Sequence, residues 1–574
     1  MAELNVTKKS ISSLFSEMQG SKFIIPDYQR PYKWDLEKCE TLWQDLTRFF
    51  EERKGNEEYY LGTVVTCKNE GSDKLQIEVI DGQQRITSLL LLLRAFYSKL
   101  ENSKIIDDNI SGLKNQIAPC IWDVNPISGR VTDTNLIHIE SRVATESDND
   151  VFHAILRTGQ AKITATDLYS KNYHYFFSKC EDYAKTNPMH WQAFCVTILK
   201  NCIILPIDCE KLDTALTIFS TLNDRGMPLS DSDIFKAQIY RTKQTPSEKS
   251  EFTTAWKELT ETVGEAGLSL DDLFRYYSHV IRGRNGDKTK EIGLRKFYAG
   301  PDNKFKKLKE PNLMQELQAL AEFWLCVKAR DAKFQEKDFI SDESFKYLHC
   351  LEHYPNEYWK YVTSAYFFKY KDSESFHSMF SMYLRSLVSF LFSEFVQKPT
   401  VNAIKDSCYQ FCIDIVDDKP LSIFGSVPSE FSNILAQSVD SKIARGMILL
   451  HAYLNSNQKT MIDPNFEIEH IFPRVWQTAN YHGWDKDQAQ LYLERYGNKV
   501  AIGKKLNIQA GNGYFGQKKK KYSGSPIANV CDLANNPKDD WTKDDIEERE
   551  KSFLSTLVGF FDSSLMANSQ SQPI

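Results

Sequence analysis

Residues 466–473 read FEIEHIFP, and this stretch decides the fold and the chemistry of the C-terminal part of the chain. It predicts a short strand on which neighbouring side chains point to opposite sides, and Pro473 would end that strand sharply. Two asparagines follow nine residues apart, Asn498 directly after a glycine and then Asn507. An acid beside a histidine, followed by two such asparagines, is the set of side chains that a nuclease using one metal ion requires.

Each residue of this set suits one task in the hydrolysis of a phosphodiester, which needs a base to activate water and a cation to offset charge. His470 suits the base, because an imidazole pKa near ~6.5 is matched to neutral pH. Glu469 can bind a hard cation such as Mg²⁺, and Asn507 can supply a second, neutral oxygen. Asn498 could hydrogen-bond the backbone around His470 and fix the ring. A lone Glu-His pair is usually a surface coincidence, so the prediction depends on the whole set.

A further motif, Phe515-x₂-Lys518-x₃-Tyr522, follows the second asparagine. The whole order resembles the HNH (ββα-metal) nucleases, and more specifically the C-terminal nuclease domain of GmrSD-type restriction proteins. One departure lies at residues 496–499, where this chain has Tyr-Gly-Asn-Lys and the family often has Leu-Gly-Asn-Leu. The C-x₂-C pairs with which some HNH proteins bind structural zinc are absent from this sequence.

The resemblance implies a role for each of these residues, with Mg²⁺ or Mn²⁺ as the cofactor. His470 would be the general base, and Asn498 would orient it. Glu469 and Asn507 would be the metal ligands. Lys518 would sit near the phosphate, although any of the three lysines that follow it could serve.

A second motif, DGQQR at residues 81–85, lies near the N-terminus between a predicted strand and a predicted helix. A glycine there lets the backbone turn tightly, and a helix N-terminus offers free N–H groups to an anion. Arg85 could clamp a phosphate through two hydrogen bonds, and Asp81 could hold a metal or polarise a water. In the alternative interpretation Asp81 is only the N-cap of the helix.

Longer matches surround this motif: residues 25–34 (IPDYQRPYKW), 60–63 (YLGT) and 219–226 (FSTLNDRG). Their order resembles the ParB/sulfiredoxin-like N-terminal domain of the same GmrSD family, in which the DGQQR box is implied to bind and hydrolyse a nucleoside triphosphate. The implied nucleotide-binding residues are Asp81, Gly82, Gln83, Gln84 and Arg85, with Gln29 and Arg30 close to the site. Asn223 and Arg225 are weaker candidates, since a polar turn between helices explains them equally well. No Walker sequence is present, so the domain would not be a P-loop enzyme.

Local patterns predict several elements of the N-terminal part. Apolar residues at helical spacing indicate a helix over residues 36–52, and residues 59–66 and 75–80 are typical of strands. A helix is expected from about residue 84 to residue 100. Ser230 is the expected N-cap of a later helix, with Asp233 completing a capping box.

The length of 574 residues predicts roughly three to four domains. We expect an α+β protein that is predominantly helical, with a ParB/sulfiredoxin-like α/β domain at its N-terminus and an HNH domain near its C-terminus. The expected boundaries are 1–245 for the nucleoside-triphosphate-binding domain, 246–415 for a helical connecting domain, 416–565 for the nuclease domain and 566–574 for a disordered tail. The aromatic residues of the middle part are typical of core packing rather than of a cofactor site.

Composition limits the class of protein further. No apolar run approaches the ~20 residues of a membrane span, and no secretory signal is present, so we expect a cytoplasmic protein without membrane contact. Twelve cysteines without paired spacing indicate free thiols in a reducing compartment. The net charge of −6 argues mildly against non-specific nucleic-acid binding. Residues 282–309, with ten Lys/Arg against three acids, are still a candidate for contacting the DNA backbone.

The two resemblances together imply a nucleoside-triphosphate-regulated, metal-dependent DNA endonuclease of the type IV restriction kind, acting in defence against phage. Its implied partner is double-stranded DNA, modified phage DNA above all, with glucosylated hydroxymethylcytosine as one target class. Cleavage should leave a 5′-phosphate. One HNH site handles one strand, so cutting both strands needs two events or two protomers, and a homodimer is one of these options.

Two alternatives stay open on the sequence. The chain could be an HNH nickase without preference for modification, held in check by the N-terminal domain until triggered. It could also be a nucleotide-switched DNA-binding adaptor with an inactive nuclease fold. The complete set of Glu469, His470, Asn498 and Asn507 argues against the adaptor, because an inactive domain has no need for all four.

Overall fold

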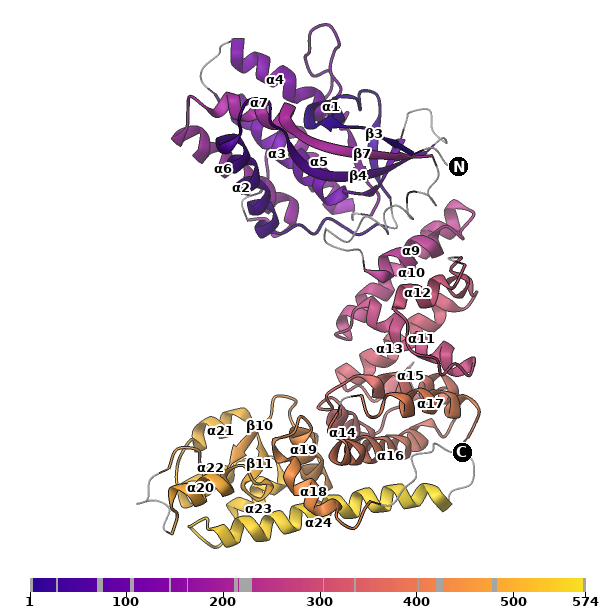
Figure 1. The fold of residues 1–574 in the computed structure, drawn as a ribbon, viewed down its shortest axis with the longest axis vertical. Coiled ribbons are helices and arrows are strands. Elements are labelled where there is room, and N and C mark those ends of the chain that lie inside the picture. Colours follow the sequence, from indigo (N-terminus) through magenta and orange to yellow (C-terminus); the bar gives the residue numbers. More distant parts are fainter. Residues whose placement is uncertain are drawn as a thin grey trace. The chain divides into compact units, whose positions relative to one another are not determined.

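The computed structural model of the chain divides into two compact units, Met1–Thr253 and Thr254–Ile574 (Figure 1). It describes residues 4–26, 29–69, 76–103, 108–143, 146–162, 164–210, 215, 230–302, 304–334, 337–400, 402–419, 427–476 and 483–570. The first unit combines a sheet with helices, and the second is almost entirely helical. The predicted class, α+β and predominantly helical, is confirmed.

A mixed seven-stranded sheet organises the first unit, in the order β1-β7-β4-β5-β3-β6 with β2 paired to β7. Its strands are β1 (Leu4–Val6), β2 (Lys9–Ser10), β3 (Lys22–Ile25), β4 (Tyr59–Asn69), β5 (Gln76–Asp81), β6 (Ile139–Ser141) and β7 (Cys202–Cys209). Strand β4 runs parallel to β7 and antiparallel to β5, and β5 runs parallel to β3. The two strands predicted near residues 59–66 and 75–80 are therefore confirmed as central neighbours, β4 and β5.

Helices surround this sheet. They are α1 (Ile11–Ser16), α2 (Leu36–Glu52), α3 (Gln83–Glu101), α4 (Asp108–Ile121), α5 (Glu146–Thr158), α6 (Leu168–Thr186), α7 (Trp191–Asn201) and α9 (Asp231–Tyr240). The next helix, α10 (Pro246–Glu265), runs across the boundary between the two units at residue 253. Helix α3 is the core helix, because its leucines at positions 89–93 are all fully buried. The predicted helices at 36–52 and 84–100 are confirmed, and Ser230 and Asp233 form the predicted capping box at the start of α9.

The second unit begins with a bundle of helices that carries aromatic residues in its core. Its helices are α11 (Leu270–Arg284), α12 (Leu294–Ala299), α13 (Leu313–Ala329), α14 (Asp342–Leu351), α15 (Tyr358–Tyr370), α16 (Phe376–Gln397) and α17 (Lys405–Val416). A short 3₁₀ helix, η2 (Lys306–Lys309), and the two-residue strands β8 (Lys333–Phe334) and β9 (Lys337–Asp338) complete it. Phe323 stacks on Phe367, and Tyr366 stacks on Tyr383. These stacked rings are core contacts, as the aromatic pattern predicted.

Helix α16 is more apolar over its length than the sequence led us to expect of any segment. It is long and apolar enough to cross a membrane by length and composition, although the sequence was expected to contain no such run. Two thirds of its apolar window (67%) is buried, and it packs on α14 and on the C-terminal helix α24 (Lys543–Gln570). Burial of this kind is typical of a core helix in a soluble protein.

The C-terminal part of the second unit contains a two-stranded antiparallel sheet of β10 (Glu467–His470) and β11 (Lys499–Ile502). Around it lie α18 (Phe431–Gln437), η3 (Ser438–Asp440), α19 (Ala444–Leu454), α20 (Lys486–Leu493), η4 (Tyr496–Asn498), α21 (Lys504–Ala510), α22 (Phe515–Tyr522) and α23 (Ala528–Ala534). The register pairs Glu469 with Val500 and His470 with Lys499. Helix α24 continues to Gln570, beyond the residue at which the disordered tail was expected to begin. All twelve cysteines are free thiols, as predicted.

Candidate active site

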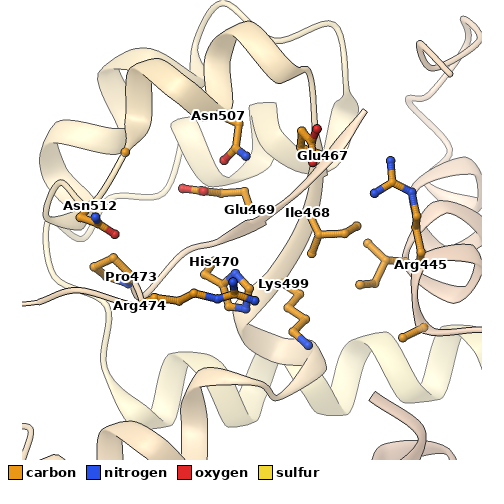
Figure 2. A pocket seen from close by; sticks show the side chains of 13 residues that line it. Arg445, Glu467, Ile468, Glu469, His470, Pro473, Arg474, Lys499, Asn507 and Asn512 are labelled. Carbon is orange, nitrogen blue, oxygen red and sulfur yellow. The ribbon is translucent and has the colours of Figure 1, made fainter. Parts of the chain in front are cut away.

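A pocket of about 540 Å³ opens beside β10. It is lined by Ala444, Arg445, Ile448, Glu467, Ile468, Glu469, His470, Pro473, Arg474, Lys499, Asn507, Gly511 and Asn512. Three of the residues selected from the sequence, Glu469, His470 and Asn507, thus line one pocket although they belong to two different elements. Figure 2 shows Glu469 and Asn507 on one side of β10, and His470 on the other.

Glu469 is held from behind by helix α22. Its side chain is 6% exposed, and its Oε1 accepts hydrogen bonds from Lys518 Nζ (2.7 Å) and from the Tyr522 hydroxyl (2.7 Å). Within the part of the chain that the structure describes, no hydrogen bond to Oε2 is formed. Asn507, at the middle of α21, likewise makes no side-chain hydrogen bond with any described residue. One carboxylate oxygen and one amide are therefore available to a ligand.

Lys518 contacts the predicted metal ligand Glu469, and its place near a phosphate stays a prediction. Its ammonium is fully buried and donates to Glu469 and to the main-chain oxygen of His470 (2.6 Å). Phe515, Lys518 and Tyr522 lie on one face of α22, and that face packs inward toward β10. Because this face is buried, Lys518 is behind the acidic ligand and does not line the open pocket. Burial lowers its pKa, and Glu469 opposes that effect.

His470 forms a pair with an acid that sequence reasoning missed. Its Nε2 lies 3.2 Å from Oε2 of Glu494. The same oxygen binds Lys499 Nζ (2.6 Å), and the other oxygen, Oε1, lies 3.6 Å from Arg474 Nη2. An ionised carboxylate only accepts, so the neutral ring carries its proton on Nε2 and keeps a lone pair on Nδ1. Burial lowers the pKa of His470, and Glu494 opposes the shift. The imidazole is therefore neutral near pH 7 and able to take a proton.

Asn498 braces the backbone that follows the histidine. It is fully buried; its Oδ1 accepts from the Phe472 N–H (2.7 Å), and its Nδ2 donates to the carbonyls of Phe472 (3.0 Å) and Leu493 (2.9 Å). Its own carbonyl accepts from the Ile471 N–H (2.9 Å). These bonds lie on the backbone next to His470, where the orienting role was predicted; the effect on the ring itself stays a prediction.

Other pocket residues were not selected from the sequence. Glu467 lies two positions before Glu469 on β10, and the alternation of side chains along a strand could have found it. Arg445 comes from α19 and lies over the Phe466 ring, and no local pattern connects it to this strand. Glu494 follows α20, and only the folded chain brings it to His470.

The DGQQR motif forms the turn between β5 and α3. Gly82 is the N-cap of α3, with φ +89°, and a Cβ there would lie 2.8 Å from a methyl group of Val64. Asp81 is the last residue of β5, so the alternative in which it caps the helix is wrong. Burial raises the pKa of Asp81, while the Gly82 N–H and the guanidinium groups of Arg85 and Arg30 oppose the rise. The acid and the two arginines thus gather at the N-terminus of one helix.

The side chains of both glutamines of the motif form hydrogen bonds within the protein. Gln84 accepts from the Lys33 N–H (2.7 Å) and donates to the Pro31 carbonyl (3.0 Å). Gln83 donates to Gln29, which in turn donates to the Ile80 carbonyl (3.0 Å). These buried bonds tie residues 29–33 to the start of α3. Asn223 and Arg225 lie outside the described residues.

Arg85 extends across the neighbouring strand β4. Its Nη1 donates to the Thr63 carbonyl (3.0 Å), and its guanidinium would lie 3.0 Å from a Cβ at Gly62. Gly62 has φ +117°, so a side chain there would be strained as well as crowded. The glycine of the YLGT segment therefore makes room for this arginine.

Comparison with known proteins identifies both parts of the chain. The family model described as the GmrSD restriction endonuclease N-terminal domain matches residues 11–240, and that of the GmrSD restriction endonucleases C-terminal domain matches residues 428–556. The search of curated proteins returned no match. The two models match in the order expected from the motifs, cover more than half of the chain together, and each contains one of the two sites, so the chain belongs to the GmrSD restriction endonuclease family.

Proposed function

We propose that this type IV restriction endonuclease cuts DNA at the pocket beside β10 with the help of Mg²⁺ or Mn²⁺, and that a nucleoside triphosphate bound at the DGQQR turn regulates the cutting. Membership of the family supports an endonuclease acting on DNA. The observation that carries the chemical proposal is one pocket lined by Glu469, Asn507 and the neutral His470 of the Glu494 pair.

The local fold supports the HNH (ββα-metal) interpretation of this part. Strand β10 pairs with β11 in an antiparallel sheet, and α21 follows β11 directly. Glu469 and His470 lie on β10, and Asn507 lies on α21. The buried Asn498, the last residue of η4 directly before the second strand, bonds the backbone of Phe472, two residues after the first strand ends. The first strand thus supplies the acid and the histidine, the helix supplies Asn507, and the turn before the second strand supplies Asn498.

The donor set of the pocket fits a hard divalent cation. Glu469 Oε2 and the Asn507 amide oxygen are oxygen ligands of the kind that Mg²⁺ and Mn²⁺ prefer, and two protein ligands leave positions for water and phosphate. Such an ion, when bound, would supply positive charge that offsets the charge developing on the phosphoryl oxygens. The rest of the chemistry belongs to the side chains of the chain.

His470 would act as the general base. Its Nδ1 takes a proton from a water molecule whose oxygen attacks phosphorus, the bond from phosphorus to the 3′ oxygen breaks, and a 5′-phosphate and a 3′ hydroxyl result, with solvent protonating the leaving oxygen. Glu494 then stabilises the imidazolium through Nε2, as an acid behind a catalytic histidine does. Lys499 and Arg474, on the same side of the strand, bring positive charge to the pocket.

Regulation by a nucleoside triphosphate is supported by the turn after β5. The first unit places Gly82 at the N-terminus of a long helix and gathers Arg85 and Arg30 near Asp81. Helix N–H groups and guanidinium groups are both suited to phosphate oxygens. We propose that the arginines bind the phosphates and that Asp81 holds an accompanying cation or polarises water.

The proposal extends to modified phage DNA as the target, to the cytoplasm as the place of action, and to a homodimer as one way in which both strands are cut. The target rests on the family resemblance, the cytoplasm on the composition of the sequence, and the homodimer on the expectation that one HNH site cuts one strand.

The first experiment compares cleavage of matched unmodified and glucosyl-hydroxymethylcytosine DNA, with Mg²⁺ or Mn²⁺, with and without nucleoside triphosphates. We expect cutting that prefers the modified DNA and that falls about 10²- to 10⁴-fold in His470→Ala. His377→Ala, which removes an exposed histidine from α16, is the matched control and should cut like the wild type.

Other outcomes would replace the proposal. Equal cutting of both DNAs would favour the triggered nickase, and full activity of His470→Ala would remove the histidine from the mechanism. DNA binding without cutting under any condition would favour the adaptor.

A further inference from the structure

Lys518 and Tyr522 share one oxygen of Glu469 and leave the other to the pocket. We infer that Lys518 is a built-in counter-charge which keeps Glu469 from holding a divalent cation by itself, so that the cation binds tightly only together with a DNA phosphate, while Tyr522 positions the same carboxylate. The inference rests on the proposed function, since it concerns the cation site of that function.

The geometry of the three side chains supports a fixed arrangement. Lys518 and Tyr522 are four positions apart on α22 and so lie on one face, and both are fully buried. Their donors lie 2.7 Å from the same oxygen, Oε1. Lys518 also donates to the His470 carbonyl, so one ammonium holds the strand at the acid and at the base. Glu469 therefore has little freedom to rotate and offer both oxygens to an ion.

The charge of Lys518 has a second consequence. A divalent cation bound through the other oxygen of Glu469 would share one carboxylate with a buried ammonium, and like charges that share a ligand repel each other. The negative charge of Glu469 is already offset by Lys518, and Asn507 is neutral. The other acid that lines the pocket, Glu467, is outnumbered by the cations Arg445, Arg474 and Lys499. A DNA phosphate would bring the missing negative charge. Affinity for the cation and affinity for DNA should therefore be coupled, each raising the other by the same factor.

A change at Tyr522 tests the positioning of Glu469 without changing the charge beside it. Its hydroxyl donates to the same oxygen as Lys518 but carries no charge. Removing the hydroxyl should only loosen the carboxylate, whereas removing the ammonium also removes the repulsion. The two changes should move the affinity for a cation in opposite directions. Loss of packing alone would lower the affinity in both variants.

The test measures Mn²⁺ binding to the full chain by isothermal titration calorimetry, first without DNA. Lys518→Gln, which keeps a donor but loses the charge, should bind Mn²⁺ at least about tenfold more tightly than the wild type. Tyr522→Phe should bind it about fivefold more weakly, the value of one lost hydrogen bond. Lys551→Gln, which removes an exposed lysine from α24, is the matched control and should not change the affinity.

A second measurement tests the coupling with DNA. In the His470→Ala background, which prevents cleavage, DNA should raise the affinity for Mn²⁺ strongly when residue 518 is lysine and much less when it is glutamine. If Lys518→Gln unfolds at a lower temperature than the wild type, Lys518→Met, which introduces an apolar side chain of similar length, repeats the test. Equal or weaker Mn²⁺ binding by folded Lys518 variants would overturn the inference.

Glu469→Gln distinguishes failure of the inference from failure of the proposed function. Loss of the Mn²⁺ site in this variant assigns the measured site to Glu469. An unchanged number and affinity of Mn²⁺ sites in Glu469→Gln, with Asp81→Asn used to identify any Mn²⁺ bound at the DGQQR turn, would overturn both the cation site and the inference. No binding by the wild type with or without DNA would also overturn both. A site that needs Glu469 but ignores Lys518 would overturn the inference alone.

Discussion

Glu494 contacts His470, Lys499 and Arg474, and it opposes the lowering of the His470 pKa that burial causes. Its carboxylate fixes the proton on Nε2 and stabilises the imidazolium that forms during the reaction. In Glu494→Gln the acceptor remains but the charge is lost. We expect the single-turnover cleavage rate to fall about 10- to 100-fold at pH 7.5, with no weakening of DNA binding, because Lys499 and Arg474 lose a competing anion.

Single-turnover cleavage at saturating enzyme measures this change, and a salt-matched binding assay measures DNA affinity. Glu374→Gln, an exposed glutamate before α16, is the control. An unchanged cleavage rate in Glu494→Gln would contradict a role of this acid in catalysis.

At the scale of elements, helices α14 and α19 each carry a histidine that its surroundings keep neutral; His349 is buried and His451 is half-buried. Burial lowers the pKa of His349 and of His451 to about 3 in each case. An unfolded histidine titrates near ~6.5, so the unfolded chain binds these protons first as the pH falls. The stability that depends on the neutral rings is fully present above about pH 6.5 and decreases below it, by up to about 2 kcal/mol for each histidine at pH 5.

Thermal unfolding of the full chain at pH 7.5, 6 and 5 measures this decrease. His451→Gln, which cannot be charged, should flatten the pH dependence in this range. His377→Gln on the exposed side of α16 should leave the dependence unchanged. A pH dependence that is the same in His451→Gln and in the wild type would contradict the assignment.

The basic segment from the end of α11 to η2 is the second feature at this scale. Arg282 is 4% exposed and pairs with Asp287, and Arg284 pairs with Glu316, so these cations serve the fold. The exposed lysines of the segment that form no ion pair with described residues are Lys288, Lys290, Lys296, Lys304 and Lys309. These side chains can still fulfil the expectation of contact with the DNA backbone.

Charge reversal of residues 288, 290 and 296 to glutamate should weaken DNA binding. The slope of log Kd against log salt should fall by about 0.9 for each phosphate that the variant no longer neutralises. Lys328→Glu, on the exposed side of α13, is the control for a single charge reversal. An unchanged slope in the triple variant would exclude the segment from the DNA interface.

At the scale of the whole molecule, the proposed nucleotide site and the proposed cleavage site belong to different compact units. Arg85→Ala removes a charge-assisted bond to the phosphates, so it should lower the affinity for a nucleoside triphosphate about 10- to 100-fold. It should also abolish the effect of the nucleotide on cleavage. Mn²⁺ binding by the other unit should not change. Arg48→Ala, an exposed arginine of α2, is the control. Nucleotide binding that is equal in both variants would contradict the site.

The sequence by itself determined the family and the order of the parts, and it predicted the chemistry that the two sites are proposed to carry out. The alternation of FEIEHIFP, the asparagine spacing and the DGQQR turn are local or ordered patterns, and they predict which residue types can serve as acid, base and anion site. Strands β4 and β5, helices α2 and α3 and the capping box at Ser230 follow from apolar periodicity and capping chemistry, which act within a few residues.

Only the tertiary structure decided which partners these residues have. Glu494 reaches His470, and α22 turns Lys518 away from the pocket and onto Glu469, because helices separated along the chain pack on one small sheet. Likewise Gln84 binds the backbone of residues 31–33, which no spacing in the sequence connects to it. Hydrogen bonds across the core depend on how elements pack, and packing depends on the shapes of all the buried side chains together, which no short pattern contains.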